Sequence, residues 1–161
     1  MRGADVSILM LHPQSKIAQL RSDALHGATH ERFRQDMVVP GICHCLDVLA
    51  AVSRMVPESR RDHLRVRLYD SLPSISLHRA DDRAFLSFFM HGHLAVKSPQ
   101  IELLGDDSLM GRCAFREMAT LWNIGRELTD VSEWRDELAA DTGGRLSNGA
   151  KAANNGAFTH V

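Results

Sequence analysis

The spacing of apolar residues changes twice along this chain, and this change restricts the fold more than any other feature. A compact apolar run opens the chain and apolar residues at helical spacing follow it. Apolar and polar residues alternate between residues 64 and 104, and helical spacing then returns over 108–128. A period of two is typical of strands and a period near 3.6 of helices. The sequence therefore predicts an α/β fold.

The predicted elements form a mixed central sheet flanked by helices. A buried strand spans 6–11, a helix capped by Ser15 follows, and a second helix runs from about Pro40 to Pro57. Further strands are predicted at 64–69, 74–78, 84–90 and 101–104, with a turn at 81–83, a helix at 108–128 and a short helix at 131–139.

The 161 residues fit one domain, which we expect to span 1–140. From residue 141 the composition shifts to Gly, Asn, Ser and Ala, and Phe158 is the one large apolar residue. Such a segment buries too little surface to offset its ordering entropy, so a disordered tail is predicted over 141–161.

The N-terminal residues look like the end of a helix that leads directly into a strand, with Gly3 at the helix terminus. A first strand and helix of the fold are therefore expected to be missing. A missing strand leaves a sheet edge unpaired, and unpaired edges favour self-association. A homodimer is expected.

Charge and composition restrict the functional class. The formal net charge of −1 argues against a dedicated nucleic-acid binder. No signal sequence is predicted, and the longest nearly apolar stretch, 42–52, is far shorter than a membrane span of about 20 residues. Cys43, Cys45 and Cys113 are expected to be free thiols in a reducing compartment. These features predict a cytoplasmic protein that binds no membrane.

Four segments resemble parts of phospholipase D-like domains. Residues 2–13 resemble the helix end and buried strand of that family, and 64–69 its next core strand. Residues 76–87 resemble its signature of His-x-Lys, an Asp-containing turn and Gly-Ser-x-Asn, and 98–103 the polar stretch after it. The resemblance implies half of a phospholipase D-like fold.

The residues that carry the family's chemistry are only partly present. The resemblance implies that His78 is the nucleophilic histidine, whereas Ala80 stands at the lysine position and Phe89 at the asparagine position. Phosphoryl transfer needs donors or cations placed where charge develops. The resemblance thus implies a degenerate, non-catalytic domain. The alternatives are a phosphodiesterase assembled from two chains with His78 as nucleophile, and a dimeric interaction scaffold.

A second resemblance concerns residues 91–102, which are similar to a segment of the effector domain behind helix-turn-helix segments in actinobacterial-type regulators. It implies a bacterial sensor or effector module. The ligand is expected to be a small or phosphate-containing molecule bound by a polar cluster, namely Lys97, Ser98, Gln100, Glu102 and, as a substitute cation, Arg79. The alternative is a solvated edge strand on which Gln100 and Glu102 share one face.

Other polar patterns favour ordinary structural roles. His91 and His93 suit a polar turn better than a metal site, and Cys43-His44-Cys45 cannot converge on one ion from a helix. Cys45 is expected in the core, and neither a metal nor a cofactor is predicted. Arg65 and Arg67 are expected on a solvated strand face, with an anion site as the alternative. Phe85, Phe88, Phe89 and Trp122 are expected in the core or at a dimer surface.

Overall fold

The structure is a computed structural model that describes residues 4–26, 38–90 and 97–140. Its elements are β1 (Val6–Leu11), α1 (Lys16–His26), α2 (Val38–Met55), the 3-10 helix η1 (Glu58–His63), β2 (Leu64–Tyr69), β3 (Ile75–Ala80), β4 (Arg83–Phe88), β5 (Gln100–Leu104), α3 (Leu109–Ile124), β6 (Arg126–Glu127) and the 3-10 helix η3 (Val131–Glu133). Helix continues over 134–140. The predicted α/β class is confirmed.

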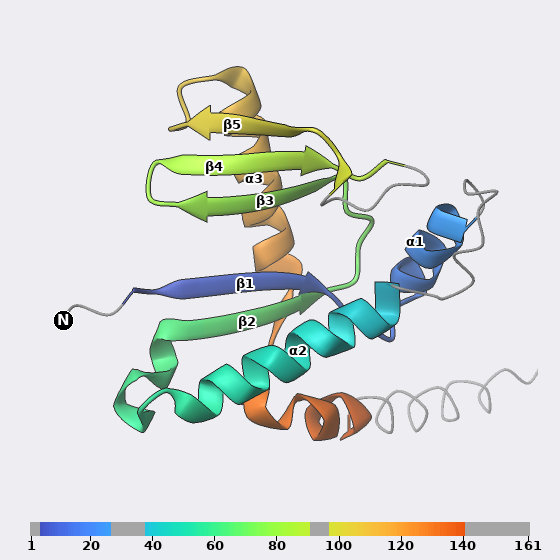
Figure 1. Cartoon of the computed structure of the whole chain (residues 1–161), viewed down its shortest axis with the longest axis vertical. Helices are drawn as coiled ribbons and strands as arrows, with labels where there is room; N and C mark the ends of the chain where they lie inside the picture. The colour runs from blue at the N-terminus through green and yellow to red at the C-terminus, as the bar shows by residue number, and fades with distance from the viewer. Residues whose placement is uncertain (1–3, 27–37, 91–96, 141–161) are drawn as a thin grey trace, which may run out of the picture.

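The strands form two small sheets, so the prediction of one mixed central sheet was wrong. Sheet A has the order β1-β2-β6, with β1 and β2 parallel and β6 antiparallel to β2. Sheet B is the antiparallel meander β3-β4-β5. β1 and β3 lie beside each other without pairing (Figure 1). The alternating pattern that predicted the strands carries no information about which edges pair.

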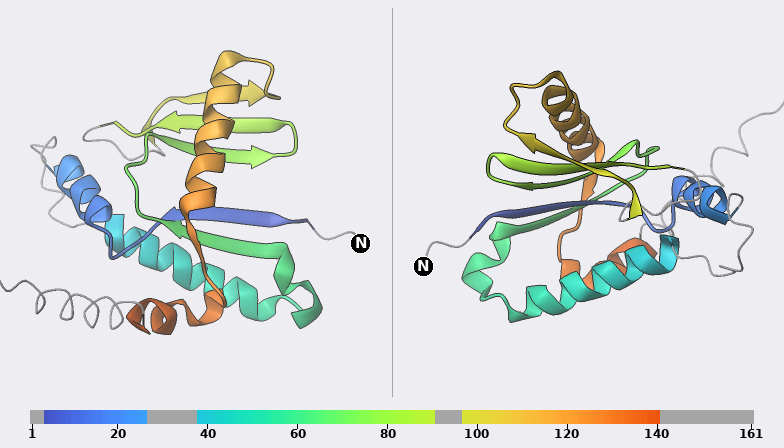
Figure 2. Two further views of the ribbon diagram at one scale, coloured as in Figure 1. Left: turned by 180° about the vertical axis from the view of Figure 1, so that it is seen from behind. Right: turned by 45° about the horizontal axis from the view of Figure 1, so that its top comes forward.

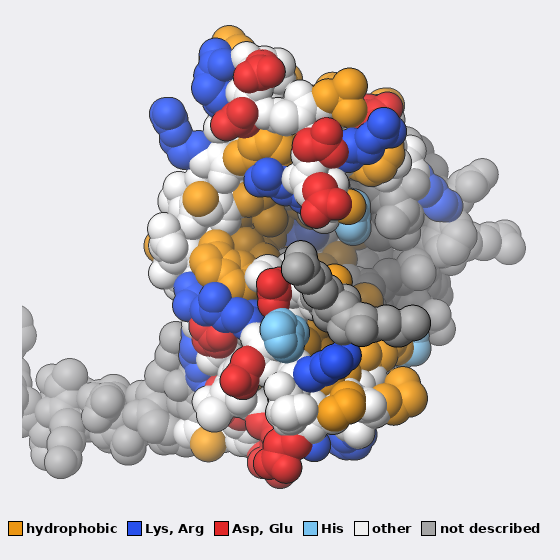
Figure 3. All heavy atoms as spheres, turned by 90° about the vertical axis from the view of Figure 1, so that its left-hand side faces the viewer, with side chains coloured by type: hydrophobic (Ala, Val, Ile, Leu, Met, Phe, Trp, Pro, Cys, Tyr) orange, Lys and Arg blue, Asp and Glu red, His pale blue; other side chains and the backbone are white. Residues whose placement is uncertain are grey.

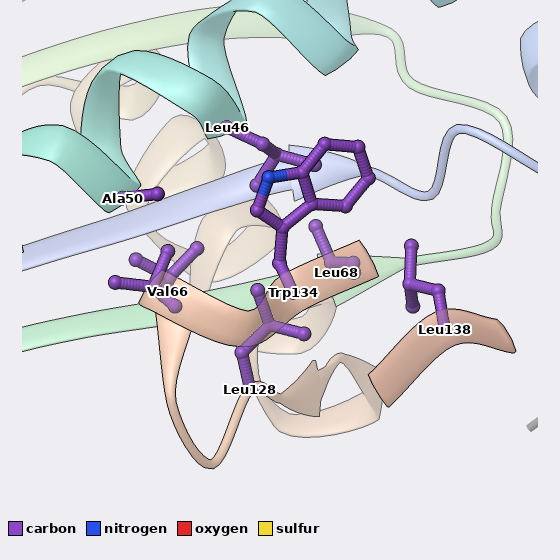
Figure 4. Packing of buried hydrophobic residues seen from close by; sticks show 8 residues of the cluster. Leu46, Ala50, Val66, Leu68, Leu128, Trp134 and Leu138 are labelled. Atoms are coloured by element: carbon purple, nitrogen blue, oxygen red, sulfur yellow. The ribbon is translucent and has the colours of Figure 1, made fainter. Parts of the chain in front are cut away.

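One face of sheet A packs against α2 and the C-terminal helix. Val66 and Leu68 on β2 and Leu46 and Ala50 on α2 belong to one buried cluster, in which the Trp134 ring lies beside Leu46 (Figure 4). Because β1 and β2 are parallel, the chain must cross over between them, and α1 and α2 form that crossover. The opposite face of sheet A carries Leu11 on β1 and Tyr69 on β2.

Helix α3 braces both sheets. Its N-terminal half places Ala114 and Phe115 against sheet B, and its C-terminal half places Leu121 against Leu11 and Tyr69 of sheet A. The left view of Figure 2 shows the helix crossing in front of the two sheets in turn. At its end, a Cβ on Gly125 would lie 3.1 Å from the Leu121 carbonyl oxygen and 3.2 Å from Leu9 Cδ1, so the tight step into β6 favours glycine.

Helix α2 exposes much of its apolar surface. Cys45 is exposed, so its prediction as a core residue was wrong, because Leu46 and Ala50 take the inward face instead. The helix begins at Val38, earlier than the apolar stretch suggested. With 18 residues and a mean hydropathy of 1.4, α2 is long and apolar enough to cross a membrane by length and composition alone. The sequence predicted no apolar stretch of this length.

Several predictions fall outside the described residues. They are the helix end at Gly3, the turn or metal site at His91 and His93, and the disordered tail over 141–161.

Candidate functional site

A cavity of about 590 Å³ lies between the two sheets. Its walls are β1, β3 and the facing side of α3, and the surface is visibly hollowed there between the halves of the molecule (Figure 3). The lining residues are Ser7, Ile8, Leu9, Tyr69, Ile75, Ser76, Leu77, His78, Arg79, Phe89, Phe115, Met118, Ala119, Leu121 and Trp122. Binding pockets for small ligands have about 300–1,000 Å³ of volume and mostly apolar walls with a few polar groups. This cleft meets both criteria.

The lining contains the guanidinium of Arg79 and the imidazole of His78, and it has no carboxylate. The Arg79 guanidinium lies 4.5 Å from the centre of the Phe115 ring, and its Nε donates to the Asp81 carbonyl oxygen at 2.8 Å. No ion pair joins Arg79 to any carboxylate among the described residues. The electrostatics of the cleft therefore favour a ligand with negative charge.

Strand β3 places His78 and Arg79 on opposite faces of sheet B. Arg79 aligns with buried Ala84 and shares the face that packs on α3. His78 aligns with Phe85, whose side chain is 44% exposed on the open face. This orientation follows from the period of two, and both residues reach the cleft because β3 is an edge strand.

The predicted ligand-binding residues on and near β5 are separate from the cleft. Gln100 and Glu102 share the open face of sheet B, as predicted, but β4 lies between them and β3. Glu102 accepts a hydrogen bond from Arg83 at 3.4 Å. Lys97 is exposed, whereas Ser98 is buried and has interactions of its own. Of the predicted site residues, His78 and Arg79 therefore both line the cleft, and the other four lie outside its lining.

The two positions at which the phospholipase D-like pattern requires other residues have different surroundings. Ala80 is exposed at the end of β3. Phe89 lines the cleft, and the Arg21 guanidinium lies 4.9 Å from its ring centre. Around His78 the lining supplies one cation, Arg79, and no amide side chain.

Arg65 and Arg67 do not form an open anion site. Both donate to the Glu127 carboxylate, with the closest contacts at 2.8 Å, and Arg67 also donates to the Trp122 carbonyl oxygen at 2.7 Å. Hydrogen bonds from Arg65 and Arg67 lower the pKa of Glu127 to about 2. Glu127 is therefore the anion that these two side chains bind.

A second cavity of about 530 Å³ lies beside η1 and is lined by charged residues of both signs. The carboxylates of Glu58, Asp62, Glu127 and Asp130 face it together with the guanidinium groups of Arg61 and Arg65. Because the carboxylates outnumber the arginines, the second cavity does not attract an anionic ligand. Over the described ranges, no group of three or more His, Cys, Asp or Glu side chains is arranged to hold a metal ion.

Comparisons of the chain with protein-family models, with curated proteins and with solved structures find no match. The site is therefore interpreted from its own residues.

Sequence reasoning missed the apolar half of the cleft. Phe115, Met118 and Trp122 lie within the helix predicted over 108–128, and nothing in their spacing separates a side chain in a core from one beside a cavity. The one related prediction was an unpaired sheet edge, expected because a first strand seemed to be missing, and it gave no position for a cleft.

Proposed function

We propose that this chain is a non-catalytic ligand-binding or regulatory module whose cleft takes a ligand with an apolar body and a negative charge. The observation that carries the proposal is the lining of the cleft, which combines apolar walls with Arg79 and no carboxylate. Burial of the apolar body supplies binding free energy, and the guanidinium selects the anion.

Fluorescence titration with anilinonaphthalene sulfonate tests this function, with uncharged phenylnaphthylamine as the matched probe. Both probes should bind in the cleft. Arg79→Gln should weaken binding of the sulfonate by about tenfold, the loss of one charge-assisted hydrogen bond, and leave the neutral probe unaffected. The control is Arg116→Gln, which removes an exposed arginine of α3 outside the cleft. Equal affinities of all three proteins for the sulfonate would contradict the proposal.

The proposal includes the hypothesis of a degenerate phospholipase D-like domain. Its support is the residue pattern itself, with Ala80 and Phe89 at positions where that family needs a lysine and an asparagine. Loss of a single well-placed donor costs about 10²–10³ in rate. Purified protein and its His78→Ala variant should therefore hydrolyse an aryl phosphodiester at the same background rate. Turnover that disappears in the variant would instead favour the two-chain phosphodiesterase.

The proposal also includes a homodimer, and an exposed stripe on α2 supports it. Gly41, Cys45, Val48, Val52 and Met55 are all exposed, and they follow one another at intervals of four, three, four and three. This is the spacing of a two-helix seam, in which an identical helix is a matching partner. Light scattering should give twice the chain mass, and Val48→Glu should give a monomer. The control is Gln19→Glu, at an exposed position of α1, which should leave the mass unchanged. A monomeric unmodified protein would contradict the dimer.

A further inference from the structure

Two unpaired strand edges face the same cleft. β1 is the last strand of sheet A on one side, and β3 is the last strand of sheet B on the other. Three consecutive residues of β1, 7–9, and five of β3, 75–79, line the cavity. Among the described residues, no backbone hydrogen bond extends from these two outer edges. Each edge presents free main-chain N–H and C=O groups, which can pair with an extended chain.

The volume of the cavity matches a short strand. Neighbouring strands lie about 4.8 Å apart, a strand rises about 3.3 Å per residue, and a sheet layer is about 10 Å thick, so each residue of an inserted strand occupies roughly 160 Å³. A cavity of about 590 Å³ therefore holds about four residues.

The walls specify which side chains such a strand should carry. Leu9, Leu77, Phe115 and Met118 lie on the α3 side of the cleft, where they offer an apolar surface. Ser76 and His78 lie on the other side, on the open face of sheet B. Alternate residues of an inserted strand would thus meet an apolar wall and a polar one. Arg79 stands on the α3 side without a carboxylate partner.

From these observations we propose that the cleft binds an extended peptide, which adds as a strand between β1 and β3. The peptide places apolar side chains toward α3 and an acidic side chain beside Arg79. This inference rests on the proposed function, because it names the class of ligand that the same cleft takes. The added strand joins the two three-stranded sheets into one sheet of seven strands, 3 + 1 + 3.

The directions of the flanking strands allow this pairing. β1 and β3 run in opposite directions (Figure 1), so the peptide is parallel to one and antiparallel to the other. Both geometries form regular ladders, and successive residues of a strand direct their main-chain groups to alternate sides. The N–H groups of the odd residues therefore pair with one sheet and those of the even residues with the other.

The test uses calorimetric titration of the full chain with two capped six-residue peptides, in which valine and threonine alternate and an aspartate stands at one end or the other. One of the two should bind. N-methylation of its amides at odd positions, and separately at even positions, should each weaken binding by about tenfold or more, because each set removes the pairing with one sheet. Ala119→Phe, which fills the cleft from α3, should abolish binding. Thr120→Phe, next to it but outside the lining, should not.

The outcomes separate this inference from the proposed function. If anilinonaphthalene sulfonate binds and neither peptide does, or if N-methylation has no effect, the peptide proposal is overturned while the ligand-binding cleft stands. If Ala119→Phe leaves peptide binding unchanged, the peptide does not occupy the cleft and the proposal also fails. If neither the sulfonate nor a peptide binds, both proposals fail together. Sensitivity to both N-methyl sets and to Ala119→Phe supports the inserted strand.

Discussion

At the scale of single residues, the most constrained polar group is the Glu127 carboxylate. It accepts hydrogen bonds from Arg65 and Arg67, and the Trp122 ring lies under both guanidinium groups, with centroid distances of 5.4 and 4.8 Å. This arrangement ties the short strand β6 to β2 through side chains as well as through the backbone. Protonation of this carboxylate should therefore lower the free energy of unfolding.

We expect a contribution from Glu127 that depends on pH. The two arginines lower its pKa from 4.5 to about 2 in the folded protein. A lowered pKa stabilises the fold fully above the unfolded value of about 4.5, and the contribution is lost as the pH falls toward 2. Urea unfolding midpoints, measured across this range, should therefore fall more steeply for the unmodified protein than for Glu127→Gln. Because the carboxylate is partly exposed, high salt should reduce the difference, and identical slopes would contradict the expectation.

The apolar residue Leu86 gives a second prediction at this scale. It is fully buried in β4, between the α3 face of sheet B and Ala114. Leu86→Ala should lower the free energy of unfolding by about 2–5 kcal/mol, since it removes packed volume that the surroundings cannot refill. Leu104→Ala, on the neighbouring strand and 63% exposed, should change it by less than about 0.5 kcal/mol. Urea denaturation measures both, and similar losses would contradict the packing described for sheet B.

The sequence predicted individual residues where a local rule applies. Ser15 accepts a hydrogen bond from the Ala18 N–H at 3.0 Å, which confirms it as the cap of α1. All three cysteines are free thiols, as predicted. Cys45 was placed wrongly because α2 is apolar around most of its circumference, so its spacing does not say which side faces the sheet. The pairing of Arg65 with Glu127 joins residues 62 positions apart and has no local signal.

At the scale of elements, helix α3 depends on its N-terminal cap. The Ser108 hydroxyl accepts a hydrogen bond from the Gly111 N–H at 2.9 Å, and so satisfies one of the first free donors of the helix. Ser108→Ala should therefore cost about 1 kcal/mol in the free energy of unfolding, while Ser108→Asp, which retains an acceptor, should cost much less. Thermal unfolding followed by circular dichroism compares the two variants. Equal losses would show that the cap hydrogen bond is not what stabilises the helix.

The bounds of some elements could be predicted closely, whereas the helix predicted over 108–128 ends at Ile124 and is followed by β6. The strands β1 and β2 have the predicted bounds, and Asp81 takes a positive φ of 53° in the turn between β3 and β4. These segments have a clear period and are bounded by turn residues, which are local signals. The start of α2 was predicted too late, because Pro40 was taken to precede the helix. Proline is tolerated in the first helical turn, since its missing N–H has no partner to lose there.

At the scale of the whole molecule, the division into two sheets could not be predicted. Strand pairing is decided by contacts between segments far apart in the sequence, and the alternating pattern of 64–104 suits one sheet or two. Only the order of the strands within sheet B could be predicted from the sequence, because consecutive short strands tend to pair. The cleft is a product of this division, so the candidate site was no more predictable than the division itself.

Because α3 packs against both sheets, we expect the two halves to unfold together. The two tryptophans, Trp122 and Trp134, report on sheet A and its surroundings, whereas the far-ultraviolet circular dichroism reports on the whole. In urea, the two signals should give superimposable transitions. A circular dichroism change that precedes the fluorescence change would show that sheet B melts by itself and that α3 does not couple the halves. Leu121→Ala, which weakens the contact with sheet A, should be the variant most inclined to separate the transitions.

The path of the chain through the two sheets also sets the order in which they can form during synthesis. Sheet B consists of consecutive strands within 75–104 and contains only short loop closures, which are fast. Sheet A begins with the first strand of the protein and is completed by β6, and the core beneath it is closed by Trp134 and Leu138. The strand that is synthesised first, β1, therefore acquires its packing partners last. A released chain truncated just before residue 126 should already protect β4 from proteolysis while β1 remains cleavable, and extension of the chain to residue 140 should protect β1 as well.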